Sequence, residues 1–152
     1  MTAPKTRDRS LLIIALHGKV AALDAETGEV RWKNGLTAGG YGEVEIAFVE
    51  DALVVSAFGA RLFCLDYLTG AERWAVDTTS AGHASIIVEA GRIFVAKAGV
   101  VDCFDLAGNR LWSQLLTGIG TGHAALGFHG NLRHARGEAH APPSTGGEPP
   151  RS

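Results

Sequence analysis

Short apolar runs, separated by turn-forming residues, dominate the chain between residues 11 and 129. Runs of this length, bounded by Gly, Asp and Asn, predict β-strands rather than helices. Some, such as 53–55 and 86–88, are apolar at every position, which favours sheets that are buried on both faces. The expected strands are 11–17, 19–24, 29–33, 43–50, 53–57, 61–66, 72–76, 84–89, 93–97, 100–105, 110–115 and 124–129.

A turn motif that connects two consecutive strands occurs three times. Each copy contains an Asp and a Gly, and a Trp follows on the next strand. The first two copies hold Asp24, Thr27, Gly28 and Trp32, and then Asp66, Thr69, Gly70 and Trp74. The third copy is one residue shorter, lacks the Thr, and holds Asp105, Gly108 and Trp112. The first two Asp residues are 42 positions apart and the next two are 39 apart. A period near forty, built from short strands, predicts the blades of a β-propeller.

Each residue type in the turn has a structural explanation. An Asp carboxylate accepts backbone N–H hydrogen bonds inside a turn, and Thr does so more weakly. Gly supplies the positive φ that closes the hairpin. The Trp carries a large ring on the next strand, where it fills space between blades. The turn therefore predicts structure and blade packing rather than catalysis.

The repeats predict an all-β fold of three four-stranded propeller blades, in which the first blade lacks its own innermost strand. Residues 122–128 resemble residues 82–88, so strand 124–129 is a spare innermost strand. We expect this strand to complete the first blade of a second copy, so that a homodimer closes a six-bladed ring by strand exchange. The alternatives are a sector that docks on a larger propeller protein and a degenerate gene fragment.

Composition divides the chain into three parts. Residues 1–10 are polar and predict a flexible arm, residues 11–131 hold the blades and the spare strand, and residues 132–152 predict a disordered tail rich in Gly and Pro. The apolar run 11–16 is shorter than a secretory signal core, and no run approaches the roughly 20 residues of a membrane span. We therefore expect a soluble, cytoplasmic protein.

The repeated pattern resembles that of PQQ-like, or quinoprotein-type, β-propellers over residues 11–131. That family includes quinone-dependent dehydrogenases, outer-membrane assembly factors and scaffolds. The resemblance implies that a dehydrogenase would bind its cofactor at the propeller axis, with a calcium ion, a catalytic Asp and commonly a vicinal disulfide. This chain has no Cys-Cys pair, and its motif Asp residues are explained by turns. We therefore expect no enzymatic activity and no cofactor.

Charge argues against two classes of binding partner, and the cysteines argue against a disulfide. The formal net charge is −2, and the basic residues are scattered, so neither nucleic acid nor a membrane surface is an expected partner. Cys64 and Cys103 hold equivalent places in neighbouring repeats and predict small buried residues rather than a disulfide or a redox pair.

One set of polar residues has a spacing that suggests a site. Gly42, Gly82 and Gly122 are spaced by 40, and each opens an expected innermost strand. The residues that follow them are Glu43, His83 and His123. Because innermost strands converge on the channel of a propeller, these side chains would meet at one mouth of it. A carboxylate and two imidazoles there would suit a divalent metal, an anion or a pH response; the alternative is three solvated loop residues.

The function expected from these patterns is a non-enzymatic scaffold that binds protein partners and associates with itself. The alternative is a regulatory propeller with a small-ligand or metal site at the channel mouth.

Overall fold

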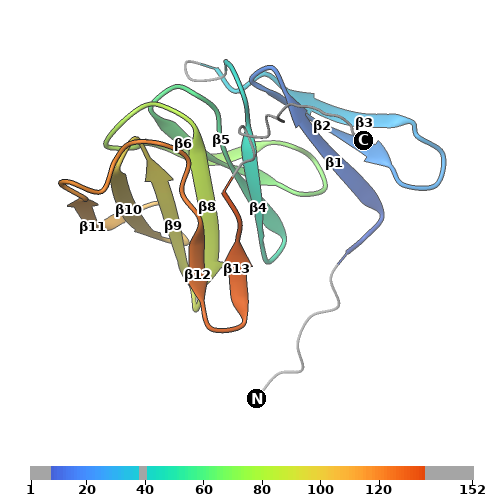
Figure 1. Cartoon of the computed structure of the whole chain (residues 1–152). Coiled ribbons are helices and arrows are strands. Elements are labelled where there is room, and N and C mark those ends of the chain that lie inside the picture. The colour runs from blue at the N-terminus through green and yellow to red at the C-terminus, as the bar shows by residue number, and fades with distance from the viewer. Residues whose placement is uncertain (1–7, 38–40, 136–152) are drawn as a thin grey trace, which may run out of the picture.

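The computed structural model describes residues 8–37 and 41–135 (Figure 1). Within these residues the chain forms strands and no helix, so the predicted all-β class is confirmed. The strands are β1 (Leu11–Leu16), β2 (Lys19–Asp24), β3 (Val30–Asn34), β4 (Glu45–Val49), β5 (Ala52–Ser56), β6 (Arg61–Asp66), β7 (Glu72–Asp77), β8 (Ala84–Glu89), β9 (Arg92–Lys97), β10 (Val100–Asp105), β11 (Arg110–Leu115), β12 (Leu126–Phe128) and β13 (Asn131–Arg133).

The first eleven strands form three antiparallel meanders. Their orders are β1-β2-β3, β4-β5-β6-β7 and β8-β9-β10-β11, and we call these sheets blades one, two and three. Asp24 pairs with Leu11 of β1, and Asp66 pairs with Ala52 of β5, so β1 is the equivalent of β5. Within the described residues, blade one therefore has no equivalent of the innermost strands β4 and β8, which lie side by side in the structure. The predicted blades, including the incomplete first one, are confirmed.

The core lies between the blades, in two separate apolar clusters. One joins blades one and two, and it includes Leu53 and Val55 of β5. The other joins blades two and three, and it includes Val54 of the same strand. Since successive side chains of a strand point to opposite faces, β5 supplies both clusters. This is why blade two has strands that are apolar throughout.

The chain continues after blade three into a hairpin that the sequence analysis did not foresee. Strand β12 is shorter than the expected strand 124–129, and it pairs with β13. Arg133 of β13 donates hydrogen bonds to the carbonyl groups of Ile86 in β8 and Ile46 in β4. Regular structure therefore continues past the predicted boundary at residue 131. Hydrogen bonds to blades two and three hold β13 in place, and the strand is too short for its sequence to show an alternating pattern. The rest of the predicted tail, from residue 136, lies outside the described residues.

Two further expectations concern the cysteines and the membrane. Cys64 and Cys103 are free and buried, as predicted. Burial raises the pKa of the Cys64 thiol to about 11, which makes it unreactive near neutral pH. In the described part of the chain there is no helix of the length and apolarity that a membrane crossing requires.

Candidate functional site

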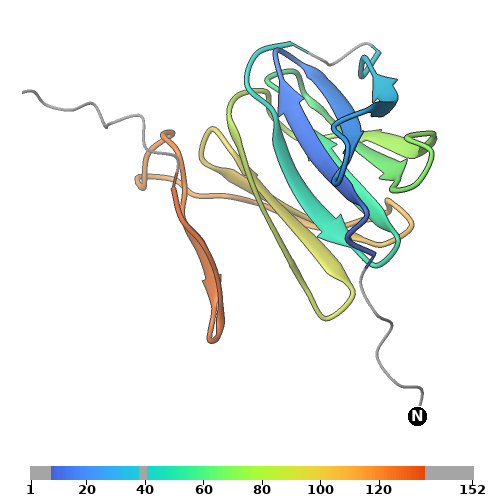
Figure 2. The same cartoon turned by 90° about the vertical axis from the view of Figure 1, so that its right-hand side faces the viewer.

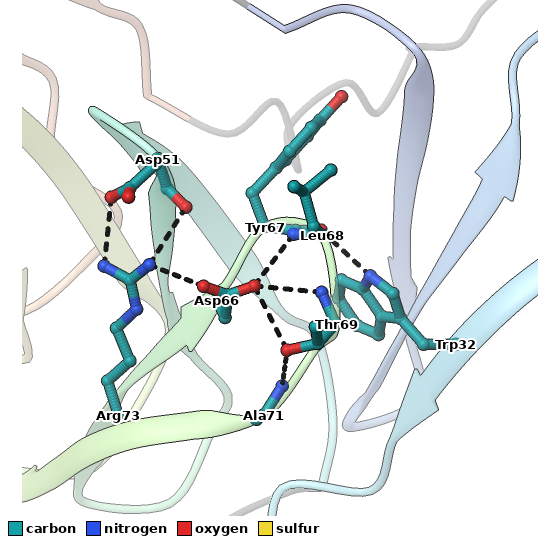
Figure 3. Close-up of polar contacts among 8 residues, drawn as sticks. All are labelled: Trp32, Asp51, Asp66, Tyr67, Leu68, Thr69, Ala71 and Arg73. Carbon is teal, nitrogen blue, oxygen red and sulfur yellow. Dashed lines mark hydrogen bonds and ion pairs between the residues drawn. The ribbon is translucent and has the colours of Figure 1, made fainter.

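The turn of blade two is held together by its own side chains (Figure 3). The Asp66 carboxylate accepts hydrogen bonds from the backbone N–H groups of Leu68 and Thr69, at 3.1 and 3.0 Å. The Arg73 guanidinium also donates to Asp66 and lies 3.0 Å from a carboxylate oxygen of Asp51. The hydrogen bond from Arg73, together with those from Thr69, holds the pKa of Asp66 below its ordinary value. The carboxylate therefore stabilises the turn.

The other two turns use their Asp residues in the same way. The N–H of Thr27 donates to the Asp24 carboxylate at 3.0 Å, and the N–H of Asn109 donates to the Asp105 carboxylate at 2.9 Å. The third turn is shorter, because the N–H of Gly108 bonds to the carbonyl of Asp105, three residues back. All three Asp carboxylates are thus committed to backbone donors.

The Trp of one blade packs against the turn of the next blade, and we call each such contact a joint. Trp32 of blade one lies against Gly70 of blade two, where an added Cβ would meet the indole at 2.3 Å. Its Nε1 donates to the carbonyl of Tyr67 at 2.9 Å. Trp74 repeats the arrangement against Gly108 of blade three. Gly is therefore required at this position of the turn because the ring occupies the place of its side chain.

The third Trp has no such joint within the described residues. Trp112 is 42% exposed, whereas Trp32 is 8% exposed, and every residue of β11 is exposed. We call the apolar surface on and after β11 the trailing face. Its exposed apolar residues are Leu111, Trp112, Leu116 and Ile119, whereas Leu115, also exposed, lies with Ser113 on the other side of the strand. Trp112 and Leu116 line a shallow depression together with Val101, Ser113 and Gln114.

The opposite end of the molecule has a matching apolar surface, the leading face, on the outer side of blade one. Leu12, Ile14 and Leu16 alternate along β1 and are 58%, 42% and 54% exposed. By strand register, Leu12 and Ile14 are the equivalents of Leu53 and Val55, which are fully buried against blade one. The leading face thus has the residues of a blade interface, and no described part of the chain packs on it as a neighbouring blade.

The β12–β13 hairpin lies beside blade three, next to β8 (Figure 2). Phe128 of β12 lies 5.3 Å from Phe94 of β9, ring centre to ring centre, and Phe94 lies 6.0 Å from Trp112. The Arg133 guanidinium of β13 also lies 3.1 Å from the buried Glu45 carboxylate of β4. Strand β13 is therefore on the side of β4, and within the described residues the other edge of β12 has no strand partner.

The structure brings Glu43, His83 and His123 together, and we call them the mouth cluster. One ligand atom from each lies within 4.8 Å of the others. Nδ1 of His83 is 2.9 Å from Oε1 of Glu43, and the two imidazole rings are 4.3 Å apart at their centres. Nδ1 of His123 is buried and has no hydrogen-bond partner. The spacing of 40 residues thus led to three side chains that do meet.

Lys97 is a buried polar residue between blades two and three, and its role was not expected from the sequence. It is 3% exposed, and its ammonium group donates to the carbonyls of Ala57 and Gly59 of blade two, at 3.0 and 2.6 Å. Burial lowers its pKa to about 8, partly offset by the nearby Asp102 carboxylate. The only signal in the sequence was a Lys at the end of an apolar strand.

Comparison with solved structures supports the propeller architecture. The chain is similar to BamB from Moraxella catarrhalis, with 27% identity and a TM-score of 0.58 over 70% of this chain and 33% of that one. It is similar in fold to quinohemoprotein alcohol dehydrogenase from Comamonas testosteroni, with 22% identity and a TM-score of 0.55 over 69% of this chain and 19% of that one. It also matches the computationally designed Ika8 protein, with 17% identity and a TM-score of 0.68 over 81% of this chain and 38% of that one.

Sequence comparison gives the family. No curated protein sequence matches the chain significantly. The chain spans about a third of the length of BamB and a fifth of that of the dehydrogenase. The family model described as "Outer membrane protein assembly factor BamB" matches residues 16–138, most of the chain. The protein therefore belongs to this BamB-like family of PQQ-type β-propeller repeats.

Proposed function

We propose that this protein is a non-enzymatic β-propeller scaffold that binds protein partners and assembles with a second copy of itself. The observation that carries the proposal is the pair of end faces. Among the described residues, Trp112 of the trailing face has no turn to pack on, and the turn of blade one on the leading face has no Trp packed on it. The trailing face of one copy could therefore supply the Trp for the turn on the leading face of another copy.

The leading-face turn matches the turns that receive a Trp inside the chain. Gly28 has a φ of +80°, close to the +75° of Gly70, and an added Cβ at Gly28 would meet no atom within 4 Å. The space that Trp32 fills beside Gly70 is therefore open beside Gly28. The carbonyl of Ala25 follows Asp24 as that of Tyr67 follows Asp66, so it is the acceptor expected for Nε1 of a second copy's Trp112.

The strand edges support the same arrangement. The edge of β1 lacks an inner strand, and the edge of β12 away from β13 lacks a partner within the described residues. Unpaired edges favour strand addition. Adding β12 of one copy to β1 of the other, at both ends, gives a closed ring of six blades, within the usual range of about four to eight.

The absence of catalysis and of a cofactor remains part of the proposal. It is supported by the Asp24, Asp66 and Asp105 carboxylates, which are occupied by turn hydrogen bonds. Among the similar solved structures, one is BamB and another is an alcohol dehydrogenase. The family model's description, an assembly factor, agrees with a role in binding proteins. A cytoplasmic location also stays a prediction.

Sedimentation velocity over a concentration series tests self-association. We expect the parent to reach twice the 15.9 kDa mass of one chain at micromolar concentration. Gly28→Ala should weaken the dimer strongly, because the new methyl group would collide with Trp112 of the partner. Trp112→Ala should weaken it as well, by removing the ring.

Gly91→Ala is the matched control. Gly91 has a φ of +76° and open space around it, so the substitution adds the same backbone strain away from both end faces. It should leave the dimer intact. A parent that stays monomeric at all concentrations would contradict self-association, and equal effects of Gly28→Ala and Gly91→Ala would contradict the proposed joint.

A further inference from the structure

The mouth cluster is built from three separate segments of the chain. Glu43 precedes β4, His83 precedes β8, and His123 precedes β12. Blade two, blade three and the terminal hairpin therefore each supply one side chain. Such an arrangement depends on the fold, because no two of the residues are close in sequence.

Backbone hydrogen bonds hold the first two segments at Phe58. Its N–H donates to the carbonyl of Tyr41 at 2.9 Å, and its carbonyl accepts from the N–H of Gly82 at 2.8 Å. The Phe58 ring also packs edge-on against His83, 5.1 Å between ring centres. Phe58 thus fixes the segment before Glu43 and the segment before His83 relative to each other.

The third segment is anchored next to His123. The Ser85 hydroxyl, in β8, donates to the carbonyl of Ala124 at 2.7 Å. The carbonyl of Gly120 lies close against Gly99, where an added Cβ would approach it to 2.6 Å. These contacts on both sides of His123 position its ring beside that of His83.

We propose that Glu43, His83 and His123 bind one Zn²⁺ ion. Two imidazoles and a carboxylate are ligands that Zn²⁺ favours, and a fourth, open position would hold water. With bonds of about 2.0–2.2 Å, tetrahedral ligand atoms lie roughly 3.3–3.6 Å apart. The side chains must therefore close by about 1 Å from their widest separation, which rotation of Glu43, the exposed member of the cluster, would allow.

Two observations favour a cation over a simple hydrogen-bonded group. Glu43 and His83 satisfy each other, but Nδ1 of His123 is buried without a partner, and a metal ion bound there would satisfy it. The two imidazole rings also lie edge to face, 4.3 Å apart at their centres, so both can reach the same ion. A metal ion at this place would therefore use both histidines.

Binding of Zn²⁺ would tie the terminal hairpin to blades two and three. The site lies within one chain, so it does not depend on self-association. Because only the folded chain assembles the three ligands, Zn²⁺ should stabilise the fold, by about 2.7 kcal/mol at a hundred times its dissociation constant. Ca²⁺, which prefers oxygen ligands, should give no comparable effect.

Isothermal titration with Zn²⁺, together with thermal unfolding with and without Zn²⁺, tests the proposal. We expect one ion per chain and a rise in melting temperature for the parent. The double variant His83→Ala/His123→Ala should bind Zn²⁺ at least about 100-fold more weakly and lose the stabilisation. The double variant His129→Ala/His134→Ala removes two exposed histidines outside the cluster and should behave as the parent.

Glu43→Gln provides the decisive variant if the double His variant does not fold. The amide still accepts a hydrogen bond from His83 but is a poor ligand, so affinity for Zn²⁺ should fall about tenfold or more. Parent-like affinity in Glu43→Gln or in the His83→Ala/His123→Ala variant would overturn the site. So would a parent whose melting temperature does not respond to Zn²⁺.

Discussion

Trp32 and Trp112 occupy the same position in two repeats. Trp32 lies in the joint between blades one and two, and Trp112 lies on the trailing face of blade three. At the joint, Trp32 is 8% exposed and donates to a carbonyl of the next turn. On the trailing face, Trp112 is 42% exposed and has no acceptor within the described residues. The burial of this Trp is therefore a property of the blade that follows it, and not of its own blade.

The two glycines at the receiving end of a joint show the same contrast. Gly70 and Gly28 share a left-handed backbone, but only Gly70 is in contact with an indole ring. The turn therefore has the same backbone conformation whether or not a Trp packs on it. The difference in contact can be measured, because matched substitutions at the two positions change one property at a time.

The largest expected difference is between the two tryptophans. Trp32→Ala should lower the free energy of unfolding by about 3–5 kcal/mol, because it empties a packed site and leaves the Tyr67 carbonyl without its donor. Trp112→Ala should cost less than about 1 kcal/mol in dilute protein. Urea unfolding of both variants measures this. A cost for Trp112→Ala that grows with protein concentration would indicate self-association, and equal costs in dilute protein would break the comparison.

A smaller difference is expected between the two glycines. Gly70→Ala should cost about 3 kcal/mol, since it adds a steric clash with Trp32 to the strain of a positive φ. Gly28→Ala should cost only the strain, about 1 kcal/mol, in dilute protein. The free energies of unfolding of the two variants are compared in urea, at protein concentrations too low for the dimer to form. If Gly28→Ala lowered the free energy of unfolding as much as Gly70→Ala under those conditions, the clash with the Trp32 indole would not explain the cost of Gly70→Ala.

Blades two and three are also connected by hydrogen bonds from the buried Lys97 ammonium group. Lys97→Met keeps the apolar stem but leaves the Ala57 and Gly59 carbonyls without their donor, so stability should fall by about 1–3 kcal/mol near neutral pH.

The pH dependence of Lys97 provides a separate check. Its folded pKa, about 8, is below the ordinary value of 10.5, so between these pH values the unfolded chain binds more protons. The contribution of Lys97 to stability should therefore rise with pH over that window. Unfolding curves at pH 7.5 and 10 should show this rise in the parent relative to Lys97→Met. A parallel pH response of the two proteins would contradict the lowered pKa.

The smallest expected effect concerns the turn of blade two at acid pH. The pKa of Asp66 is lowered, chiefly by Arg73, below the ordinary 3.8, so its stabilisation is present above that pH. It is lost as the pH falls through the folded pKa. Thermal unfolding should show a decrease in melting temperature below about pH 4. The decrease should be smaller in Asp66→Asn, which already lacks the charge, and an identical decrease would exclude Asp66 as a contributor.

Repetition made most of the blades predictable. The strand limits, the turns and the missing inner strand of blade one all followed from one pattern compared with its own copies. The spacing of 40 residues also selected Glu43, His83 and His123, since equivalent positions of successive blades meet at one end of the sheets. Their distances, and the orphaned Nδ1 of His123, required the packed structure.

Residues without a counterpart in other repeats escaped prediction. Lys97 and Arg133 bond to carbonyl groups of other blades, and β13 is only three residues long. Nothing in the neighbouring sequence distinguishes such residues from ordinary surface charges. Their partners are far away along the chain, so their role depends on how the blades stack.

Local chemistry made the turns and strands readable from the order of residues, because an Asp bonds to N–H groups two or three positions away and apolar runs alternate between two faces. The exposure of each tryptophan was decided only by tertiary structure. Three nearly identical segments end with a buried, a half-buried and an exposed indole, because burial requires a second surface, and each blade receives that surface from its neighbour.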